Sequence, residues 1–563
     1  MQRPTGLSAA ADLLDSTLNA LLRVRPLHRA LLLAAGLLCP CAALAEITPD
    51  SNPSSSLGTL VNGTSQPCAA SACSVTGGTS SGTNLFHRFL EFDTRQTNIE
   101  TITFDNSNHS RLFVGVTNPT GTFITSPVLL SSAGHLYWLS PGGIQIQGGG
   151  AFGNVANLQL STATSLAFGG GRSFDFDTTT AKDIPALSGS PLGFFTSPEK
   201  PLVNFGDGTI AISNQLTIDS ALLLDSRNDI IVNGIIQTSG GSLSAKAKAG
   251  FALSGLVATE GGDVSILSEH DLVVSGRKSR VDSLGPTGGI NTEGGNVYLV
   301  SSTGWIRNTF GISAESGGPY GFLSAGTGKI ALKAAGFIGE PSRTELPTIG
   351  NDQAPLSYVA SPLLITSAAK LAAESASGSI LINYSPDQGE AVNRSLVIGN
   401  IQFPDFLDTS LLISGLEALQ GNFNVRASGD VVLADTLRLV GNDYSRISAN
   451  FGESRIEVAP GAVVTTQTGG QIVLQGLLDN RGSLLVDRGP LELDGLVHQS
   501  SGSIEILKGA DLRFDFCPDN CLGSTLSLLE GSRLSGMGSV SGRIGDSTVG
   551  TLTQQAGSRI SPG

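Results

Sequence analysis

The 563-residue sequence is poor in charged, aromatic and sulfur-containing residues. Only 14% of the residues are charged and 6% are aromatic, and the chain has 2 Met, 2 Trp and 6 Cys. Low charge together with 40% hydrophobic residues argues against an intrinsically disordered chain. The net charge of −14 argues against nucleic acid and anionic membranes as main partners, because both attract Lys and Arg.

A long apolar run is also missing. Beyond residue 45 no segment approaches the ~18 apolar residues of a membrane-spanning helix, so we predict no membrane span in the mature protein. Before that point, Arg23, Arg25 and Arg29 precede a short apolar run over 30–38, and Ala43-Leu44-Ala45 has the small residues typical of a cleavage site. We therefore predict a signal peptide over 1–45, cleaved after Ala45.

Cysteine pairs and histidines give no metal-site pattern. The cysteines left after cleavage form two close pairs, which predict the disulfides Cys68–Cys73 and Cys517–Cys521 in an oxidising compartment. A shared metal is the alternative, but the pairs are far apart, and the six His are scattered without His-x-x-x-His spacing. We predict no metal and no cofactor.

Motifs for phosphate binding and catalysis are missing as well. The glycine triplets at 148–150 and 169–171 lack a following Lys-Ser/Thr, and no Gly-Gly-x-Gly-x-Asp calcium repeat occurs. No Ser/His/Asp arrangement is evident, so we predict that the protein is not an enzyme. The enzymatic alternative is a polysaccharide-cutting β-helix, which needs clustered carboxylates. Its candidates flank turns, where Asx hydrogen bonds also explain them: Asp175, Asp177, Asp225, Asp229, Asp263, Glu269 and Asp271.

What the chain does have is 72 Gly, which break up short β-rich runs. Similar runs surround glycine pairs that begin at 240, 261, 294 and 317, at separations of 21, 33 and 23 residues. A strand repeat of about 20–25 residues without helices predicts an all-β solenoid, in which the 33-residue step is one coil plus a loop. We expect coils over 241–338 and 409–563, with a Pro-rich, loop-rich junction over 339–408.

The segment Asn84–Asp93 looks like a site, because a His-Arg pair lies among three Phe. In the structural interpretation, Phe86, Phe89 and Phe92 pack in the cap of the solenoid while His87 and Arg88 face solvent or form local hydrogen bonds. In the functional interpretation, the His-Arg pair contacts a partner or is a catalytic pair.

Several segments, in order, resemble the N-terminal secretion (TPS) domain of the filamentous haemagglutinin family, the exported partners of two-partner secretion systems. They are Ile47–Asp50, Leu60–Gly63, Val75–Thr79, Gly82–Phe89, His135–Leu139 and Ser140–Ile144. The family usually has Asn-Pro-Asn-Gly-Ile at the last turn; here Ser140 and Gly142 replace both Asn, while Pro141, Gly143 and Ile144 remain. Asn118-Pro119 resembles the Asn-Pro step of that motif at a displaced position in the sequence.

The resemblance implies a secretion domain over 46–240 and a right-handed parallel β-helix whose early strands cap its N-terminal end. It implies unfolded export through the periplasm and a dedicated outer-membrane transporter, to the surface or medium of a Gram-negative-type bacterium. The expected role is that of an adhesin, haemagglutinin or biofilm protein, with host-cell or matrix glycans or proteins as partners. The residues expected to serve recognition or capping are Asn84, Leu85, Phe86, His87, Arg88, Phe89, Pro141, Gly143 and Ile144.

A second alternative comes from the C-terminal segment. The Gly-rich segment 531–542 and the ending Arg559–Gly563 resemble the coils of autotransporter passengers, in which such a step precedes another strand. The autotransporter-like passenger and a chain truncated at residue 563 therefore both stay open.

Overall fold

The structure is a computed structural model that describes residues 46–95, 98–198, 202–275, 288–308, 322–339, 362–386, 395–408, 410–515, 524–541 and 551–562. Strands make up 56% of it, in long parallel sheets, which confirms an all-β parallel β-helix. The hand of its winding stays a prediction. Among the described residues, no helix has the length and hydropathy needed to cross a membrane. The predicted signal peptide, its cleavage site and the Cys517–Cys521 pair lie outside the described residues.

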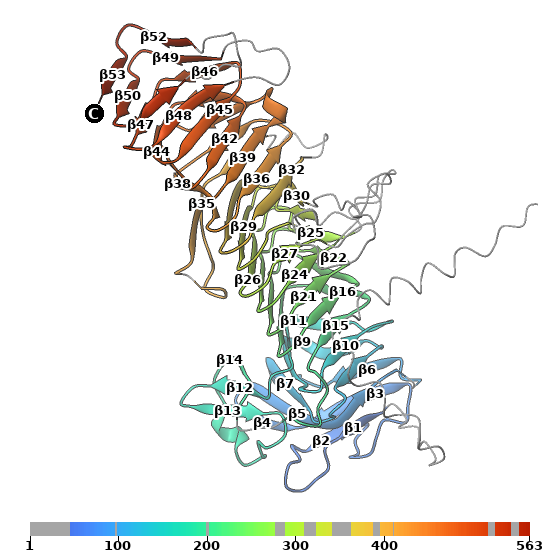
Figure 1. Cartoon of the computed structure of the whole chain (residues 1–563). Helices are drawn as coiled ribbons and strands as arrows, with labels where there is room; N and C mark the ends of the chain where they lie inside the picture. The colour runs from blue at the N-terminus through green and yellow to red at the C-terminus, as the bar shows by residue number, and fades with distance from the viewer. Residues whose placement is uncertain are drawn as a thin grey trace, which may run out of the picture. The chain divides into compact units, whose positions relative to one another are not determined.

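Successive coils stack through parallel ladders (Figure 1). The first ladder runs through the whole described chain: β5 (Asn84–Asp93), β7 (Arg111–Val116), β9 (Val128–Leu139), β11 (Phe152–Ser161), β17 (Ala221–Ser226), β20 (Leu243–Ala247), β23 (Val264–Ser268), β26 (Val297–Ser301), β29 (Lys329–Ala334), β31 (Lys370–Ser375), β35 (Leu412–Ala418), β38 (Thr436–Gly441), β41 (Val463–Thr468), β44 (Ser483–Arg488), β47 (Ser503–Ile506), β50 (Arg533–Gly536) and β53 (Arg559–Pro562).

Two further ladders close the N-terminal coils. One comprises β8 (Thr122–Ile124), β10 (Ile144–Ile146), β15 (Ile210–Ile212), β18 (Ile230–Val232), β21 (Phe251–Leu253), β24 (Leu272–Val274) and β27 (Ile306–Arg307). The other comprises β16 (Gln215–Ile218), β19 (Ile235–Thr238), β22 (Leu256–Ala258), β25 (Gly289–Asn291), β28 (Phe322–Ser324), β30 (Leu363–Ser367), β32 (Ile380–Tyr384), β36 (Phe423–Ala427), β39 (Tyr444–Ala449), β42 (Gln471–Gln475), β45 (Pro490–Asp494), β48 (Asp511–Asp515) and β51 (Ser539–Ser541).

A new third ladder replaces the short one in the C-terminal coils. It comprises β33 (Leu396–Ile398), β37 (Val431–Leu433), β40 (Arg455–Val458), β43 (Leu477–Asn480), β46 (Val497–Ser500), β49 (Thr525–Leu528) and β52 (Thr551–Gln554). Because β30 to β33 belong to these ladders, the ladders continue through the described part of the predicted junction 339–408. One-turn 3-10 helices occupy Ile184–Ala186 and Asn450–Gly452.

The register gives the length of each coil. Leu222, Leu243 and Val264 are successive partners 21 residues apart, and Val297 follows 33 residues after Val264. The longer coil carries its extra residues between β24 and β25, where the sequence predicts a loop. The next partner of Val297 is Ile330, again 33 residues on, so the predicted 23-residue step to the glycine pair at 317 is not a coil repeat.

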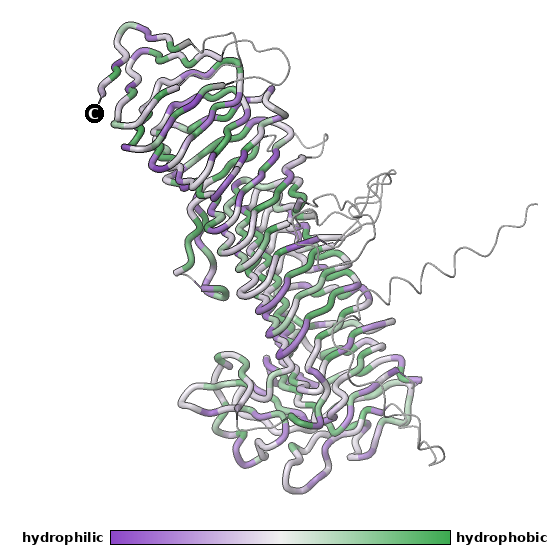
Figure 2. The backbone as a smooth tube through the Cα atoms, viewed as in Figure 1, coloured by the Kyte–Doolittle hydropathy of each residue, from purple (hydrophilic) through white to green (hydrophobic). Residues whose placement is uncertain are grey.

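Alternation along the strands produces the core. In β20 and β41, every second residue is buried and the residues between them are partly exposed. The buried residues form one cluster that runs through the coils from Ile47 to Leu534. Figure 2 shows hydrophobic and hydrophilic stretches alternating along the same coils. Strand propensity and period-2 burial therefore account for the stack.

The N-terminal end of this stack has a different construction. Antiparallel strands meet β5 and each other there: β1 (Ile47–Pro49), β2 (Thr59–Val61), β3 (Ala72–Gly77) and β4 (Thr79–Ser81). We call these four strands the cap. β3 also continues into β6 (Thr101–Phe104) and β9 by parallel pairing. The cap therefore covers the edge that the first coil would otherwise expose.

A separate antiparallel sheet and one hairpin lie outside the coils (Figure 1). The side sheet consists of β12 (Ser165–Phe168), β13 (Arg172–Asp175) and β14 (Pro191–Phe195). Its apolar side chains form a second cluster with residues of β5, β7 and β9. The hairpin pairs β34 (Asn400–Gln402) with β35 and forms a third cluster over β26, β29 and β31.

Candidate recognition and capping site

β5, the strand Asn84–Asp93, is the boundary between the cap and the first coil. Its cap-side neighbours are β1 and β4, both antiparallel. On the other edge it pairs in parallel with β7 and β8. Every residue from Asn84 to Phe89 is buried, so β5 is covered on both faces.

The phenylalanines of β5 pack into two different cores. Phe89 and Phe92 point into the coil, where Phe92 meets Trp138 edge-on with ring centroids 4.7 Å apart. Phe86 points outward and stacks on Phe113 at 4.6 Å, under the side sheet. All three rings are fully buried, as predicted, but they pack in the coil and under the side sheet rather than in the cap. The second core was not predicted.

His87 is an interior residue, so the expectation that it faces solvent is wrong. Its Nδ1 lies 3.2 Å from the hydroxyl of Thr59, and its ring meets Phe104 edge-on at 5.6 Å. The Nε2 atom has no hydrogen-bond partner among the described residues. Burial, followed by the charge of His109, lowers the pKa of His87 to about 3. The imidazole is therefore neutral at physiological pH and is not available for an outside contact in the folded protein.

Arg88 is also buried, and its bonds are long-range rather than local. Nε donates to the Phe176 carbonyl at 2.8 Å, Nη2 to the Asp175 carbonyl at 2.9 Å and Nη1 to the Ser55 carbonyl at 2.5 Å. Burial lowers the pKa of Arg88, while the carboxylates of Asp50, Asp177 and Asp175 raise it again. Arg88 thus joins a loop that follows β1 to the side sheet, by geometry that only a guanidinium fork supplies.

Asn84 makes a second link to the same region. Its Nδ2 donates to the carbonyls of Leu187 and Gly189 at 2.7 and 2.8 Å. The outward-facing residues of β5 are therefore Asn84, Phe86 and Arg88, and all three contact residues 168–189. Their order in the strand follows the period of 2.

The predicted turn at Pro141 lies in the next coil. The Gly143 amide donates to the Ser140 carbonyl at 3.0 Å, and the Ser140 hydroxyl donates to the Gly143 carbonyl at 3.0 Å. Gly143 has φ +121°, which glycine adopts without strain. Ile144 is buried between Thr122 and Ile210 in the ladder. A serine hydroxyl thus holds this turn.

The turn at Asn118-Pro119 stacks directly on the turn at Pro141. Ile144 pairs with Thr122, which places the segments 118–122 and 140–144 in the same register of adjacent coils. The two turns close in the same way, since the Gly121 amide donates to the Asn118 carbonyl at 3.0 Å. A Cβ on Gly142 would lie 2.4 Å from the Gly121 nitrogen. Gly142 is therefore required by the close approach of the two turns.

Arg227 is a site residue that the sequence did not point to. Its Nε and Nη2 donate to the Pro141 carbonyl at 3.0 and 2.9 Å, and Nη2 also donates to the Gly206 carbonyl. The available signal was an arginine in the predicted turn Asp225–Asp229 of a chain with little charge. The structure places Asp225 and Ser226 at the end of β17 and only 227–229 between β17 and β18.

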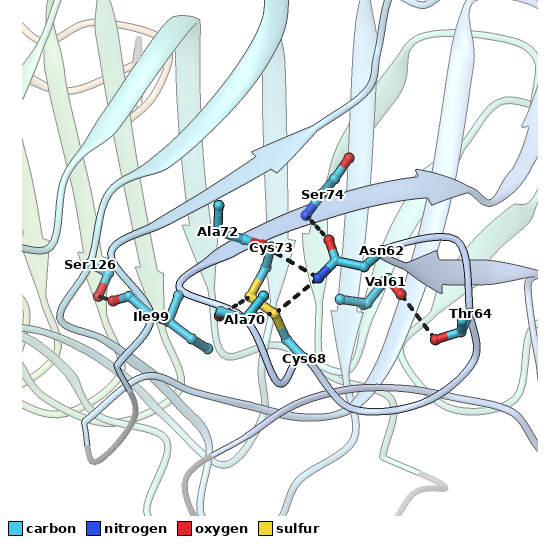
Figure 3. The surroundings of a disulfide bond; sticks show 10 residues. All are labelled: Val61, Asn62, Thr64, Cys68, Ala70, Ala72, Cys73, Ser74, Ile99 and Ser126. Atoms are coloured by element: carbon cyan, nitrogen blue, oxygen red, sulfur yellow. Dashed lines mark hydrogen bonds between the residues drawn. A yellow bond between two sulfur atoms is a disulfide. The ribbon is translucent and has the colours of Figure 1, made fainter.

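The predicted Cys68–Cys73 disulfide is present in the cap (Figure 3). The Cys68 amide donates to the Ile47 carbonyl at 3.1 Å, so the disulfide loop is attached to the first strand. Asn62 completes the turn beside it: its side chain accepts from the Ser74 amide at 2.8 Å and donates to the Ala72 carbonyl at 3.4 Å.

The carboxylates proposed for an enzyme accept hydrogen bonds at turns and between coils. Asp229 accepts from the Gly250 amide at 2.7 Å, and Asp263 accepts from the Asn296 amide at 2.7 Å. Asp271 pairs with Arg307 at 2.8 Å. Among the described residues, no group of three or more His, Cys, Asp or Glu could hold a metal ion.

The predicted site residues therefore differ in their roles. Asn84, Phe86 and Arg88 attach the side-sheet segment to β5, whereas Leu85, His87 and Phe89 face the interior of the coil. The Pro141 carbonyl accepts from Arg227, and Gly143 and Ile144 belong to the turn and the ladder that follow it. Comparisons of the chain with models of protein families, with curated proteins and with solved structures find no match.

Proposed function

We propose that the protein is the secreted partner of a two-partner secretion system. It is exported unfolded through the periplasm and a dedicated outer-membrane transporter, and it acts at the cell surface or in the medium as an adhesin or biofilm protein. The observation that carries this proposal is the position of β1: its residues Ile47–Pro49 directly follow the predicted cleavage site and pair with β5 in the cap.

The construction of the coils supports export in the unfolded state. Each coil pairs only with its neighbours, so coils can be added one at a time as the chain emerges. Every added coil buries apolar side chains and opposes backward sliding. The Cys68–Cys73 disulfide spans a sequence separation of only 5, so it closes a small loop that leaves the unfolded chain narrow enough for threading through a pore.

The outer surface supports a binding role more than a chemical one. Polar side chains link neighbouring coils along the outer surface, as in Gln215, Gln237 and Glu260, whose side chains are hydrogen-bonded in series at 3.4 and 2.7 Å. A repeated polar surface of this kind suits an extended glycan or protein partner.

The test is secretion from a Gram-negative host that expresses the protein with or without a candidate two-partner transporter. Mature protein should reach the medium only with the transporter. Gly143→Ala should reduce export, whereas Gly461→Ala should not, although both glycines have positive φ of +121° and +78°. Secretion without any transporter would contradict the proposal. Binding of purified protein to cells and immobilised glycans then tests adhesion.

A further inference from the structure

Buried Arg88 and half-buried Arg227 close the N-terminal region through partners that lie far along the chain. Arg88 donates to the carbonyls of Asp175 and Phe176, 87 and 88 residues later. Arg227 donates to the carbonyl of Pro141, 86 residues earlier. Both guanidinium groups use main-chain acceptors here, so replacing a partner's side chain would not remove these bonds.

The apolar contacts around Arg88 have the same long range. Phe86 lies 5.1 Å from the ring of Phe174 and 6.2 Å from that of Phe168. Phe113 and Tyr137 on β7 and β9 belong to the same outer cluster. Before residues 166–187 arrive, this face of three neighbouring strands lacks most of its cover, since Leu57 is the upstream covering residue of the cluster and the other covering residues follow β9. An exposed aromatic face of this kind loses most of the hydrophobic stabilisation that its burial supplies.

Hydrogen bonds also connect β4 and β5 to the downstream segment. The Leu187 and Gly189 carbonyls accept from Asn84, and the Pro185 carbonyl accepts from the Ser81 hydroxyl at 3.0 Å. Strands β4 and β5 of the cap region are thus both bound to a segment about one hundred residues downstream.

We propose that Arg88 and Arg227 act as two latches that delay closure of the N-terminal region until residues 175–189, and then residue 227, have left the transporter. The inference rests on the proposed function for its biological meaning. Before the first latch closes, β5 has its inner packing, its ladder bonds, the Phe86–Phe113 stack and the Arg88 bond to Ser55, but its outer face lacks the side-sheet segment. Afterwards the capped first coils form a base on which later coils stack.

The order of closure can be measured on the whole chain without its signal peptide. During refolding from denaturant, pulsed hydrogen exchange read by mass spectrometry should show 84–89 gaining protection in the same phase as 174–189. Protection of 84–89 in an earlier phase than 174–189 would overturn the proposal.

Variants provide the second measurement, on native protein. Arg88→Lys keeps the charge but loses the fork, and it should speed exchange in 174–189 by about 10- to 100-fold, because bonds from a charged donor are lost. The matched control is Arg95→Lys, just after β5, whose guanidinium is 40% exposed and pairs with the Asp93 carboxylate at 2.7 Å. Equal exchange in the two variants would refute the latch. If Arg88→Lys does not fold, Asn84→Ala replaces it with the same expected direction.

These outcomes separate the two proposals. Refolding needs no transporter, so early closure of β5 would refute the latch and leave the secretion proposal untouched. Secretion without a transporter would refute the proposed function and leave the measured order of closure valid.

Discussion

Substitution of Gly262 by Ala tests the stacking of the coils directly. Gly262 is the second glycine of a Thr-Glu-Gly-Gly turn, and an added Cβ would lie 2.1 Å from the Gly241 carbonyl oxygen of the preceding coil. Gly295 and Gly328 repeat this approach, each with 2.1 Å to the glycine carbonyl before it. The glycine pairs of the sequence therefore mark positions where two backbones touch.

The loss of stability expected for Gly262→Ala follows from this distance. An ordinary carbon–oxygen contact is more than 3 Å, so alanine forces the two coils apart locally by roughly 1 Å. The oxygen that blocks the added Cβ belongs to the main chain, which cannot rotate away as a flexible side chain can. Overpacking usually costs about 1–3 kcal/mol, and we expect about 3 kcal/mol here. The Thr259 hydroxyl bond to the Gly262 carbonyl would weaken as well.

Hydrogen exchange at the turn is the appropriate assay, because a solenoid need not unfold in one step. Gly262→Ala should speed exchange of residues 238–262 by about 100-fold, the factor that corresponds to about 3 kcal/mol. The control is Gly169→Ala, where no atom lies within 4 Å of the added Cβ and φ is not positive. If Gly262→Ala exchanges no faster than Gly169→Ala, the close-approach argument is refuted.

Further changes test the cap and the hairpin. Since the pKa of His87 is about 3 in the fold against an ordinary value of 6.5, the unfolded state binds its proton first. Stability should thus be intact above pH 6.5 and fall by up to about 1.4 kcal/mol per pH unit towards pH 3, and His87→Leu should weaken this dependence in acid-unfolding curves. Reduction of Cys68–Cys73 should destabilise the cap by about 2 kcal/mol, visible as faster exchange at 47–75, and unchanged exchange would contradict its structural role. Phe403→Ala should lower the free energy needed to open the hairpin by about 3 kcal/mol, whereas Phe406→Ala should have little effect because Phe406 is 36% exposed. Equal hydrogen exchange at β34 in the two variants would disprove the packing.

Much of the fold was predictable because it is local. Alternation of apolar residues and glycine-centred turns predicts strands and coils, and both depend only on neighbours in sequence. The 33-residue coil was recognisable since charges and a Pro interrupt the pattern after Val274. The glycine pair at 317 predicted a wrong coil length, because a glycine pair is also an ordinary turn signal. The coil length is defined instead by the contact of Gly328 with Gly295.

The partners of the candidate site were not predictable in this way. The aromatic block was correctly predicted to be buried, but alternation alone does not reveal that a strand is covered on its outer face too. Arg88 looked solvent-exposed because an isolated buried guanidinium is rare. Its acceptors are main-chain carbonyls, which every residue has, so no residue type marks them. Arg227 was missed for the same reason.

The long coils show how the solenoid accepts insertions. From Val264 to Leu416 the successive ladder steps include 33, 33, 41 and 43 residues, yet the parallel register is kept throughout. Longer loops cost little, since each doubling in length adds only about 0.6 kcal/mol of closure entropy. The same coils carry the hairpin on their outer face, where Phe403 packs with Tyr298 at 5.8 Å above the small side chains of Ala331 and Ala372. The added burial offsets the loop cost, so surface segments can vary here while the ladders beneath them stay continuous.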